Sequence, residues 1–153
     1  MVFATGFDAM TGSLLKMNIV GRKNFTLNDE WQEGPKTYLG LGVHGFPNMF
    51  TITGPGSPSV LTNMPRAIEQ HVDWISSLLS YAKANNVSEI EAERDAMLEW
   101  TEHVSASAKS TLLPKGKNSW YFGANISGKP SVFMPYAGGL NNYRTFCENV
   151  ASN

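Results

Sequence analysis

The residues best suited to chemistry lie in a short segment, 54–59 (GPGSPS), rich in glycine and proline. This segment separates a run of alternating β-formers at residues 49–53 (MFTIT) from a helical pattern that starts near Pro65. Its spacing resembles the G-x-G-x-x-G loop that binds pyrophosphate at a helix N-terminus. However, Ser59 replaces the third glycine, and two prolines remove N–H donors from the loop. The segment therefore argues against a dinucleotide fingerprint.

The geometry of a tight loop before a helix still suits a ligand. Small residues allow close approach, and a helix start presents free N–H groups and a partial positive charge. Thr62 or Asn63 is expected to cap this helix, with Pro65 in its first turn. Such an end favours an electron-rich carbonyl or a developing anion. A plain turn is the alternative that the local sequence leaves open.

Other catalytic classes find little support. Neither Ser57 nor Ser59 lies in a G-x-S-x-G motif, which disfavours a serine hydrolase. The three histidines, at positions 44, 71 and 103, are far apart in the sequence, and Cys147 is the one cysteine, so no metal-ligand cluster is predicted. The acidic residues between 89 and 102 have the pattern of a solvated helix face, and no carboxylate pair can be assigned to acid–base chemistry.

A second candidate region is the aromatic, glycine-bearing loop that follows Pro114. Trp120 and Tyr121 lie in it, ahead of Gly123 and Gly128. Aromatic side chains on such a loop often close over a flat ligand, with the indole N–H as a donor. They can equally anchor the loop onto the core, and the residues alone leave both interpretations open.

These segments must be positioned by a few regular elements. Apolar residues at helical spacing predict a helix from about residue 65 to 84. The Ser88-to-Glu91 spacing predicts a capping box that starts a second long helix reaching about residue 110. Asn141 or Asn142 is expected to cap a closing helix. Strands are expected at 2–5 and 49–53, and loops, turns and a minor strand at 11–47.

Composition restricts the possible partners. The 153 residues carry 12 Lys and Arg against 13 Asp and Glu, a formal net charge of −1, without a run of like charge. Nucleic acid and anionic membranes are therefore not expected as partners. No apolar stretch approaches the roughly 20 residues needed to span a bilayer, and the N-terminus lacks signal-peptide character. A cytoplasmic location is the resulting expectation.

Four segments, taken in order, resemble class B flavin monooxygenases of the Baeyer–Villiger branch (cyclohexanone and phenylacetone monooxygenase-like). They are ATGFDAMTG at 4–12, GPKTYLGLGVHGFPNMFTITGPGSPSVLTNM at 34–64, IEQHVDWI at 68–75 and SWYFGANISGKPSVFMPYAGGLNNYR at 119–144. The resemblance implies an α/β fold: the C-terminal portion of a two-domain Rossmann-type FAD- and NAD(P)-binding flavoprotein, with two long helices and long functional loops. Residues 1–153 would form a single partial domain. Residues 1–84 would end the FAD-binding domain, and 85–153 would supply a helix and the NADP-contacting loop.

The resemblance also implies an activity. The parent enzyme uses FAD, NADPH and O2 to convert ketones to esters or lactones through a flavin C4a-peroxide. The family's essential arginine and both glycine fingerprints would belong to a missing N-terminal part, so no catalytic residue is assigned in this chain. The isolated chain is therefore expected to be inactive.

Site residues follow from the same resemblance. Thr62, Asn63 and Met64 would face FAD, and Trp120 would contact NADP. The ketone pocket would be lined by Leu61, Thr62, Met64, Met134 and Pro135. Two alternatives remain: a non-catalytic gene remnant or binding module, and a flavin monooxygenase that oxygenates nitrogen or sulfur instead of a ketone.

Overall fold

The protein is built from helices joined by long irregular segments. The computed structural model describes residues 1–2, 7–116, 119–124 and 126–152. Its α-helices are α1 (Gly12–Lys16), α2 (Leu27–Glu30), α3 (Met64–Ala84), α4 (Arg94–Lys109) and α5 (Leu140–Ser152). Short 3-10 turns are η1 (Arg22–Asn24), η2 (Ser59–Leu61), η3 (Leu113–Lys115) and η4 (Trp120–Phe122). Within these described ranges there is no strand, and β-pairing is limited to two isolated bridges.

Helix α3 forms where the apolar periodicity predicts it. The Asn63 side-chain oxygen accepts the Arg66 N–H at 3.2 Å, and Pro65 occupies the first turn, where its missing N–H costs nothing. The expected helix at 65–84 is thus confirmed, and of the two proposed caps Asn63 is correct. The start of this helix is therefore fixed by its own side-chain cap.

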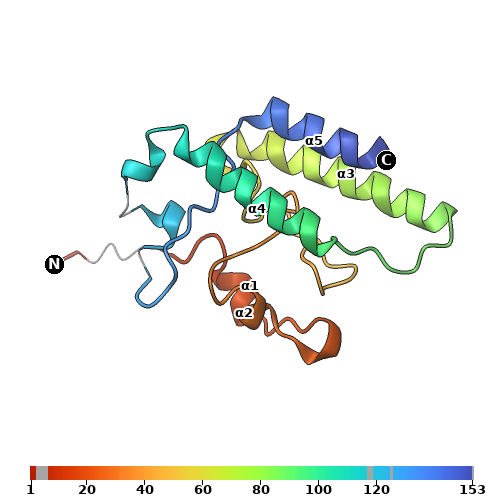
Figure 1. Ribbon diagram of the computed structural model, residues 1–153, viewed down its shortest axis with the longest axis horizontal. Coiled ribbons are helices and arrows are strands. Elements are labelled where there is room, and N and C mark those ends of the chain that lie inside the picture. Colours follow the sequence, from red (N-terminus) through yellow and green to blue (C-terminus); the bar gives the residue numbers. More distant parts are fainter. Residues whose placement is uncertain (3–6, 117–118, 125, 153) are drawn as a thin grey trace.

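The main core lies between α4, α5 and the segment around Leu39 and Leu41. Helices α3 and α5 run side by side, and α4 crosses beside them (Figure 1). The core side chains are Leu39, Leu41, Trp100, Val104, Tyr136, Tyr143 and Cys147, all buried. Because this cluster joins residues from 39 to 147, the segment after α4 folds back onto the middle of the chain.

A smaller lobe is formed by residues 12–49. Helices α1 and α2 pack against each other, and α2 begins with a capping box in which Thr26 and Asp29 exchange hydrogen bonds. Its core consists of Leu27, Trp31, Val43, Phe46 and Met97. The sequence predicted only loops, turns and a minor strand here. Both short helices were missed, and the strand is reduced to the isolated bridges.

The strand expected at residues 49–53 is wrong. Thr53 adopts a positive φ of 53°, which interrupts any extended run, and the Thr51 hydroxyl donates to the Gly40 carbonyl at 2.8 Å. No second strand pairs with this segment in the described part of the chain, so its β-formers lack the ladder that a strand requires. The predicted α/β class is not confirmed, because the described part of the chain is helical and contains no strand. Of the other expected strand, at 2–5, residues 3–5 lie outside the described residues.

The beginnings of the later helices also differ from expectation. Helix α4 starts at Arg94, not at Ser88, because residues 88–93 are non-helical and are held by tertiary contacts. The Ile90 carbonyl accepts from the Asn48 amide at 2.8 Å, and Glu91 pairs with Arg22 at 2.7 Å instead of closing a capping box. Helix α5 starts at Leu140, so the proposed asparagine caps at 141 and 142 lie inside it.

Candidate functional site

The loop at residues 54–59 is held by hydrogen bonds from Thr37 and from Trp100 of α4. The Thr37 hydroxyl donates to the Pro55 carbonyl at 2.5 Å, and the Trp100 indole donates to the Gly56 carbonyl at 3.0 Å. Gly56 has φ +85°, and a Cβ there would lie 2.8 Å from the Thr37 hydroxyl, so glycine is required. The loop is consequently a buried turn that is fixed by these contacts.

The amides of this loop do not form a phosphate cradle. The Gly56 N–H donates to the Met134 carbonyl at 2.7 Å, and the Ser57 N–H donates to the Gly54 carbonyl at 3.1 Å. Both donors are consumed within the protein. Together with the two prolines, these bonds leave few donors for a phosphate on the glycine-rich loop itself.

The start of α3 is where a free backbone donor appears. Asn63 takes up the Arg66 amide, Pro65 has none, and the Met64 N–H finds no acceptor among the described residues. Thr62, just ahead, is extended with φ −140° and ψ −179°. Leu61, Thr62 and Met64 are each partly exposed. The Met64 N–H, at the positive end of a 21-residue helix, is thus available to an electron-rich group.

The segment around Met134 and Pro135 lies directly against the 54–59 loop. Besides the bond to the Met134 carbonyl, the Tyr136 N–H donates to the Ser57 carbonyl at 2.7 Å. Met134 and Pro135 are both buried. Met134 also borders a cavity of about 270 Å³ shared with Trp100 of α4. The structure therefore brings these two predicted pocket residues beside the loop, with their side chains turned into the protein.

Trp120 and Tyr121 have different environments. Their rings meet edge to face with centroids 4.6 Å apart, and the Tyr121 carbonyl accepts from the Met134 N–H at 2.9 Å. Tyr121 also contacts Phe133 edge to face. Trp120 remains 36% exposed. Tyr121 thus anchors the loop, whereas Trp120 is accessible to a ligand.

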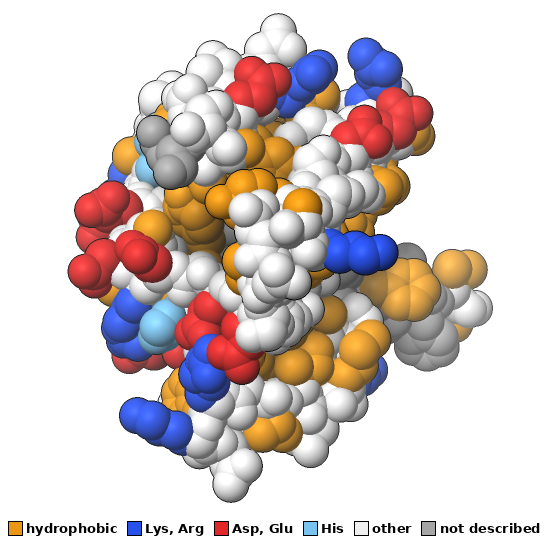
Figure 2. All heavy atoms as spheres, turned by 90° about the vertical axis from the view of Figure 1, so that its right-hand side faces the viewer, with side chains coloured by type: hydrophobic (Ala, Val, Ile, Leu, Met, Phe, Trp, Pro, Cys, Tyr) orange, Lys and Arg blue, Asp and Glu red, His pale blue; other side chains and the backbone are white. Residues whose placement is uncertain are grey.

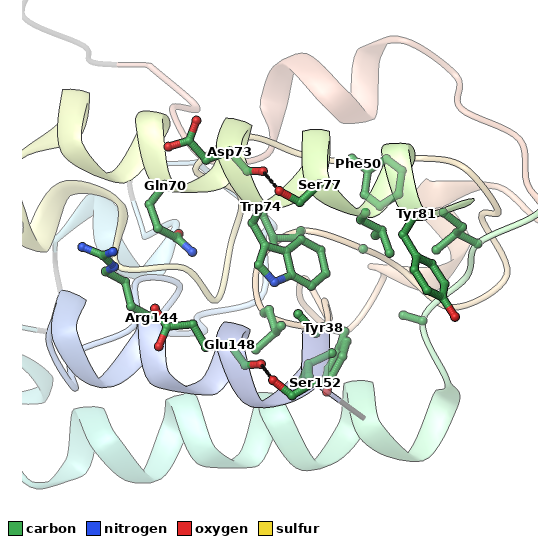
Figure 3. A pocket seen from close by; sticks show the side chains of 18 of the residues that line it. Tyr38, Phe50, Gln70, Asp73, Trp74, Ser77, Tyr81, Arg144, Glu148 and Ser152 are labelled. Carbon is green, nitrogen blue, oxygen red and sulfur yellow. Dashed lines mark hydrogen bonds between the residues drawn. The ribbon is translucent and has the colours of Figure 1, made fainter. Parts of the chain in front are cut away.

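A larger groove of about 1390 Å³ opens between α3, α5 and the segment before α4. Figure 3 shows charged and amide side chains at one end, Gln70, Asp73, Arg144 and Glu148, and the Trp74 ring further along. The Trp74 indole donates to the Cys147 carbonyl at 2.8 Å, which fixes α3 against α5. None of the site residues predicted from the sequence lines this groove.

His71 of α3 is the most strongly perturbed titratable side chain near the loop. It is fully buried, and its Nδ1 accepts the Thr53 N–H at 2.9 Å. Burial lowers its pKa from 6.5 to about 4, so the ring is neutral at pH 7. Since Nδ1 is the acceptor, the proton lies on Nε2, for which the described residues provide no partner. His71 is a packing histidine that ties the turn ahead of the loop to α3.

Neither a metal site nor a membrane-spanning helix is found among the described residues. No group of three His, Cys, Asp or Glu side chains in these ranges could hold a metal ion. No helix in the described ranges is long and apolar enough to cross a membrane.

The residues present fit a flavin at the α3 start in one specific respect. A flavin ring has carbonyl oxygens that accept hydrogen bonds and that gain negative charge on reduction. The unpaired Met64 N–H and the helix dipole offer such a group a donor and a favourable field. Asn63, in contrast, uses its side-chain oxygen to cap the helix, so it contributes to the site through the backbone it holds.

Comparison with known proteins gives a consistent family. No family model matches the chain. It is 44% identical over 149 residues to a cyclohexanone 1,2-monooxygenase of Acinetobacter sp, covering 97% of this chain and 27% of that protein. The chain is homologous to a segment of Baeyer–Villiger-type flavin monooxygenases.

Further relatives extend this result. A phenazine N-monooxygenase of Lysobacter antibioticus is 43% identical over 151 residues, 99% of this chain and 27% of that protein. The solved structure of OTEMO in complex with FAD and NADP superposes with a TM-score of 0.90 at 39% identity, over 98% of this chain and 27% of that one. The chain therefore spans about 27% of the length of the Baeyer–Villiger-type relatives that it matches.

One interaction set was not found from the sequence. Lys129 donates to both Asp8 and Thr11, more than 100 residues away. A single lysine in a GKP tripeptide has no periodicity or spacing that would have indicated this contact.

Proposed function

We propose that this chain provides the flavin-facing helix start and the NADP-contacting loop of a Baeyer–Villiger monooxygenase that uses FAD and NADPH to convert ketones to esters or lactones. The observation that carries the proposal is the free Met64 N–H at the start of α3, in a segment homologous to enzymes of this family. Residues 1–84 would belong to the FAD-binding domain, and 85–153 would supply the helix and loop. O2 is the proposed co-substrate.

Each part of the site has a separate proposed task. The bound flavin supplies hydride acceptance and oxygen activation. Met64 donates its N–H to the flavin ring, and the α3 dipole stabilises negative charge there. Thr62 and Asn63 fix the geometry of this donor, the first through its extended backbone and the second through its cap. Trp120 contacts NADP with its exposed indole.

The ketone pocket is proposed to form around the same helix start. Leu61, Thr62 and Met64 are partly exposed and would line it. Met134 and Pro135 are buried against the 54–59 loop, so they would support the pocket wall from behind. We assign no catalytic residue in this chain, because the resemblance places the family's essential arginine in the N-terminal part of the enzyme.

We further propose that additional polypeptide, corresponding to the N-terminal part of the relatives, completes the enzyme in the cytoplasm. On α3, the stripe formed by Ile68, Val72 and Leu79 is 39%, 45% and 49% exposed. The spacing of these residues places them on one face of the helix, beside the face that packs on α5. Figure 2 shows further hydrophobic side chains gathered around a hollow at the end where α3 and α5 finish. Such surface is typical of an interface.

The experiment uses this chain together with a complementary polypeptide, the part of the Acinetobacter cyclohexanone 1,2-monooxygenase that the chain does not match. Co-expressed and loaded with FAD, the pair should consume NADPH and O2 with cyclohexanone and form its lactone, detected by gas chromatography. Each polypeptide alone should be inactive. A soluble, flavin-loaded pair that forms no ester or lactone from any ketone would contradict the proposal.

A second candidate is N-oxygenation, which the 43% identity to a phenazine N-monooxygenase favours. Both reactions use the flavin and NADPH. They differ in the substrate group that is oxygenated, which is a ketone in the first reaction and a nitrogen in the second. The same preparation, incubated with phenazine, distinguishes them: N-oxide formation without lactone would select this second function.

A further inference from the structure

Lys129 forms a largely buried ion pair with the N-terminal segment. Its ammonium donates to the Asp8 carboxylate and to the Thr11 hydroxyl, and Thr11 in turn donates to Asp8 at 3.3 Å. The side chains of Lys129 and Asp8 are only 12% and 25% exposed. Removing one partner would leave the other charge largely buried and unpaired, so breaking this pair is expected to cost more than breaking a surface ion pair.

Two glycines, Gly12 and Gly123, leave space for the side chains of the ion pair. At Gly12, a Cβ would lie 2.5 Å from the Asp8 Cβ, so any larger residue would displace the carboxylate. At Gly123, φ is +70° and a Cβ would lie 3.2 Å from the Lys129 side chain. Glycine is thus needed on both sides of the ion pair.

Lys129 belongs to a loop that folds back on itself. The Val132 N–H donates to the Phe122 carbonyl at 3.2 Å, and the Met134 N–H donates to the Tyr121 carbonyl at 2.9 Å. Lys129 lies between these paired ends, and Trp120 directly precedes them. Fixing the Lys129 ammonium therefore restrains the loop that carries the exposed indole.

The other end of the ion pair reaches the candidate site. The Ser59 hydroxyl contacts the Met10 sulfur at 3.8 Å, which places the 8–12 segment beside η2. Turn η2 ends at Leu61, two residues before the Asn63 cap of α3. The 8–12 segment thus links the Trp120 loop to the start of α3.

We propose that the Lys129–Asp8–Thr11 cluster is a latch that sets the position of the Trp120 loop relative to the α3 start. Lys129 and Asp8 are then positioning residues for NADP contact. The identity of the ligand rests on the proposed function, whereas the latch itself concerns contacts within this chain.

The latch is tested by hydrogen–deuterium exchange on the 153-residue protein. In Lys129→Met and in Asp8→Asn, amides of residues 119–124 and 126–133 should exchange about tenfold faster, while α3 and α4 keep their protection. Lys115→Met, which removes an exposed lysine that precedes the loop in the sequence, is the matched control and should leave the loop unchanged. The double variant should exchange no faster than the single ones, because both disrupt one interaction. Unchanged exchange in both single variants would overturn the latch.

A second measurement tests the positioning role. In the flavin-loaded pair with the complementary polypeptide, Lys129→Met should weaken NADP+ binding about tenfold without changing the visible spectrum of bound FAD, and Lys129→Arg should recover most of the affinity. Equal NADP+ affinity for Lys129→Met and wild type would overturn the positioning role. Absence of NADP+ binding by the wild-type pair would count against the proposed function, and the exchange experiment would still decide the latch.

Discussion

Trp100 offers the sharpest test of how the 54–59 loop is held. Its indole N–H is the donor to the Gly56 carbonyl at 3.0 Å, and its ring lies within 5.3 Å of the Tyr136, His103 and Phe146 rings. Trp100→Phe removes the donor and leaves a buried carbonyl without its partner, which costs about 1–3 kcal/mol. The smaller ring also leaves space in the core. We expect the free energy of unfolding to fall by about 2–4 kcal/mol in total.

The matched control is Trp120→Phe, the same change at the exposed tryptophan of the loop. It should alter the free energy of unfolding by less than about 0.5 kcal/mol. Urea denaturation followed by far-ultraviolet circular dichroism suits both variants, because this signal does not depend on tryptophan emission. Equal stability of the two variants would refute the claim that the indole of Trp100 holds the loop.

Three further results are expected. The pKa of His71 is about 4 in the folded protein and 6.5 in the unfolded chain, so between these pH values the unfolded chain binds one more proton. The free energy of unfolding should therefore fall as pH drops from 6.5 to 4, by at most about 1.4 kcal/mol per pH unit. His71→Gln should remove this contribution and His103→Gln should retain it; identical acid profiles for both would contradict the assignment. Asn63→Ala should cost about 1 kcal/mol in urea melts through loss of the α3 cap, and a change below 0.3 kcal/mol would speak against the cap. Gly56→Ala should cost about 1–3 kcal/mol, since it forces a Cβ into a left-handed conformation against Thr37, and unaltered stability would disprove that requirement.

The long helices were largely predictable because their signals are local. In α3, apolar residues recur at three and four, and Asn63 and Pro65 mark the start, so periodicity and capping chemistry agree. The body of α4 was found for the same reason. Its start was not, because residues 88–93 satisfy their polar groups on Asn48, Gly45 and Arg22. Such tertiary partners leave no trace in a local window.

The strand at 49–53 failed for a related reason. Alternating β-formers indicate a strand only where a neighbouring strand supplies hydrogen bonds. In this chain the segment instead bonds to Gly40, Leu41 and His71, and Thr53 turns it away at positive φ. The β-propensity of this segment was outweighed by hydrogen bonds to the backbone of residues 40 and 41 and to the His71 side chain, 18 residues after Thr53.

In the candidate site, too, the features with local signals could be predicted and the long-range contacts could not. The α3 start could be predicted from its cap and proline, and the rejection of a phosphate loop from its composition. Family resemblance predicted Met134 as a pocket residue, but its contact with Gly56 was not predicted, since nothing in the spacing joins segments nearly 80 residues apart. The Lys129 contact with Asp8 was not indicated by either route.

The central claim, that the α3 start binds flavin through the Met64 N–H, is tested most directly by FAD affinity of the pair formed with the complementary polypeptide. Met64→Pro removes this one donor at a helix position where proline is well tolerated, and Met64→Leu keeps the donor while changing the side chain. We predict that wild type and Met64→Leu retain FAD through gel filtration, whereas Met64→Pro binds it at least about tenfold more weakly, a loss of about 1.4 kcal/mol. Equal FAD affinity for Met64→Pro and wild type, with the pair intact, would contradict the claim.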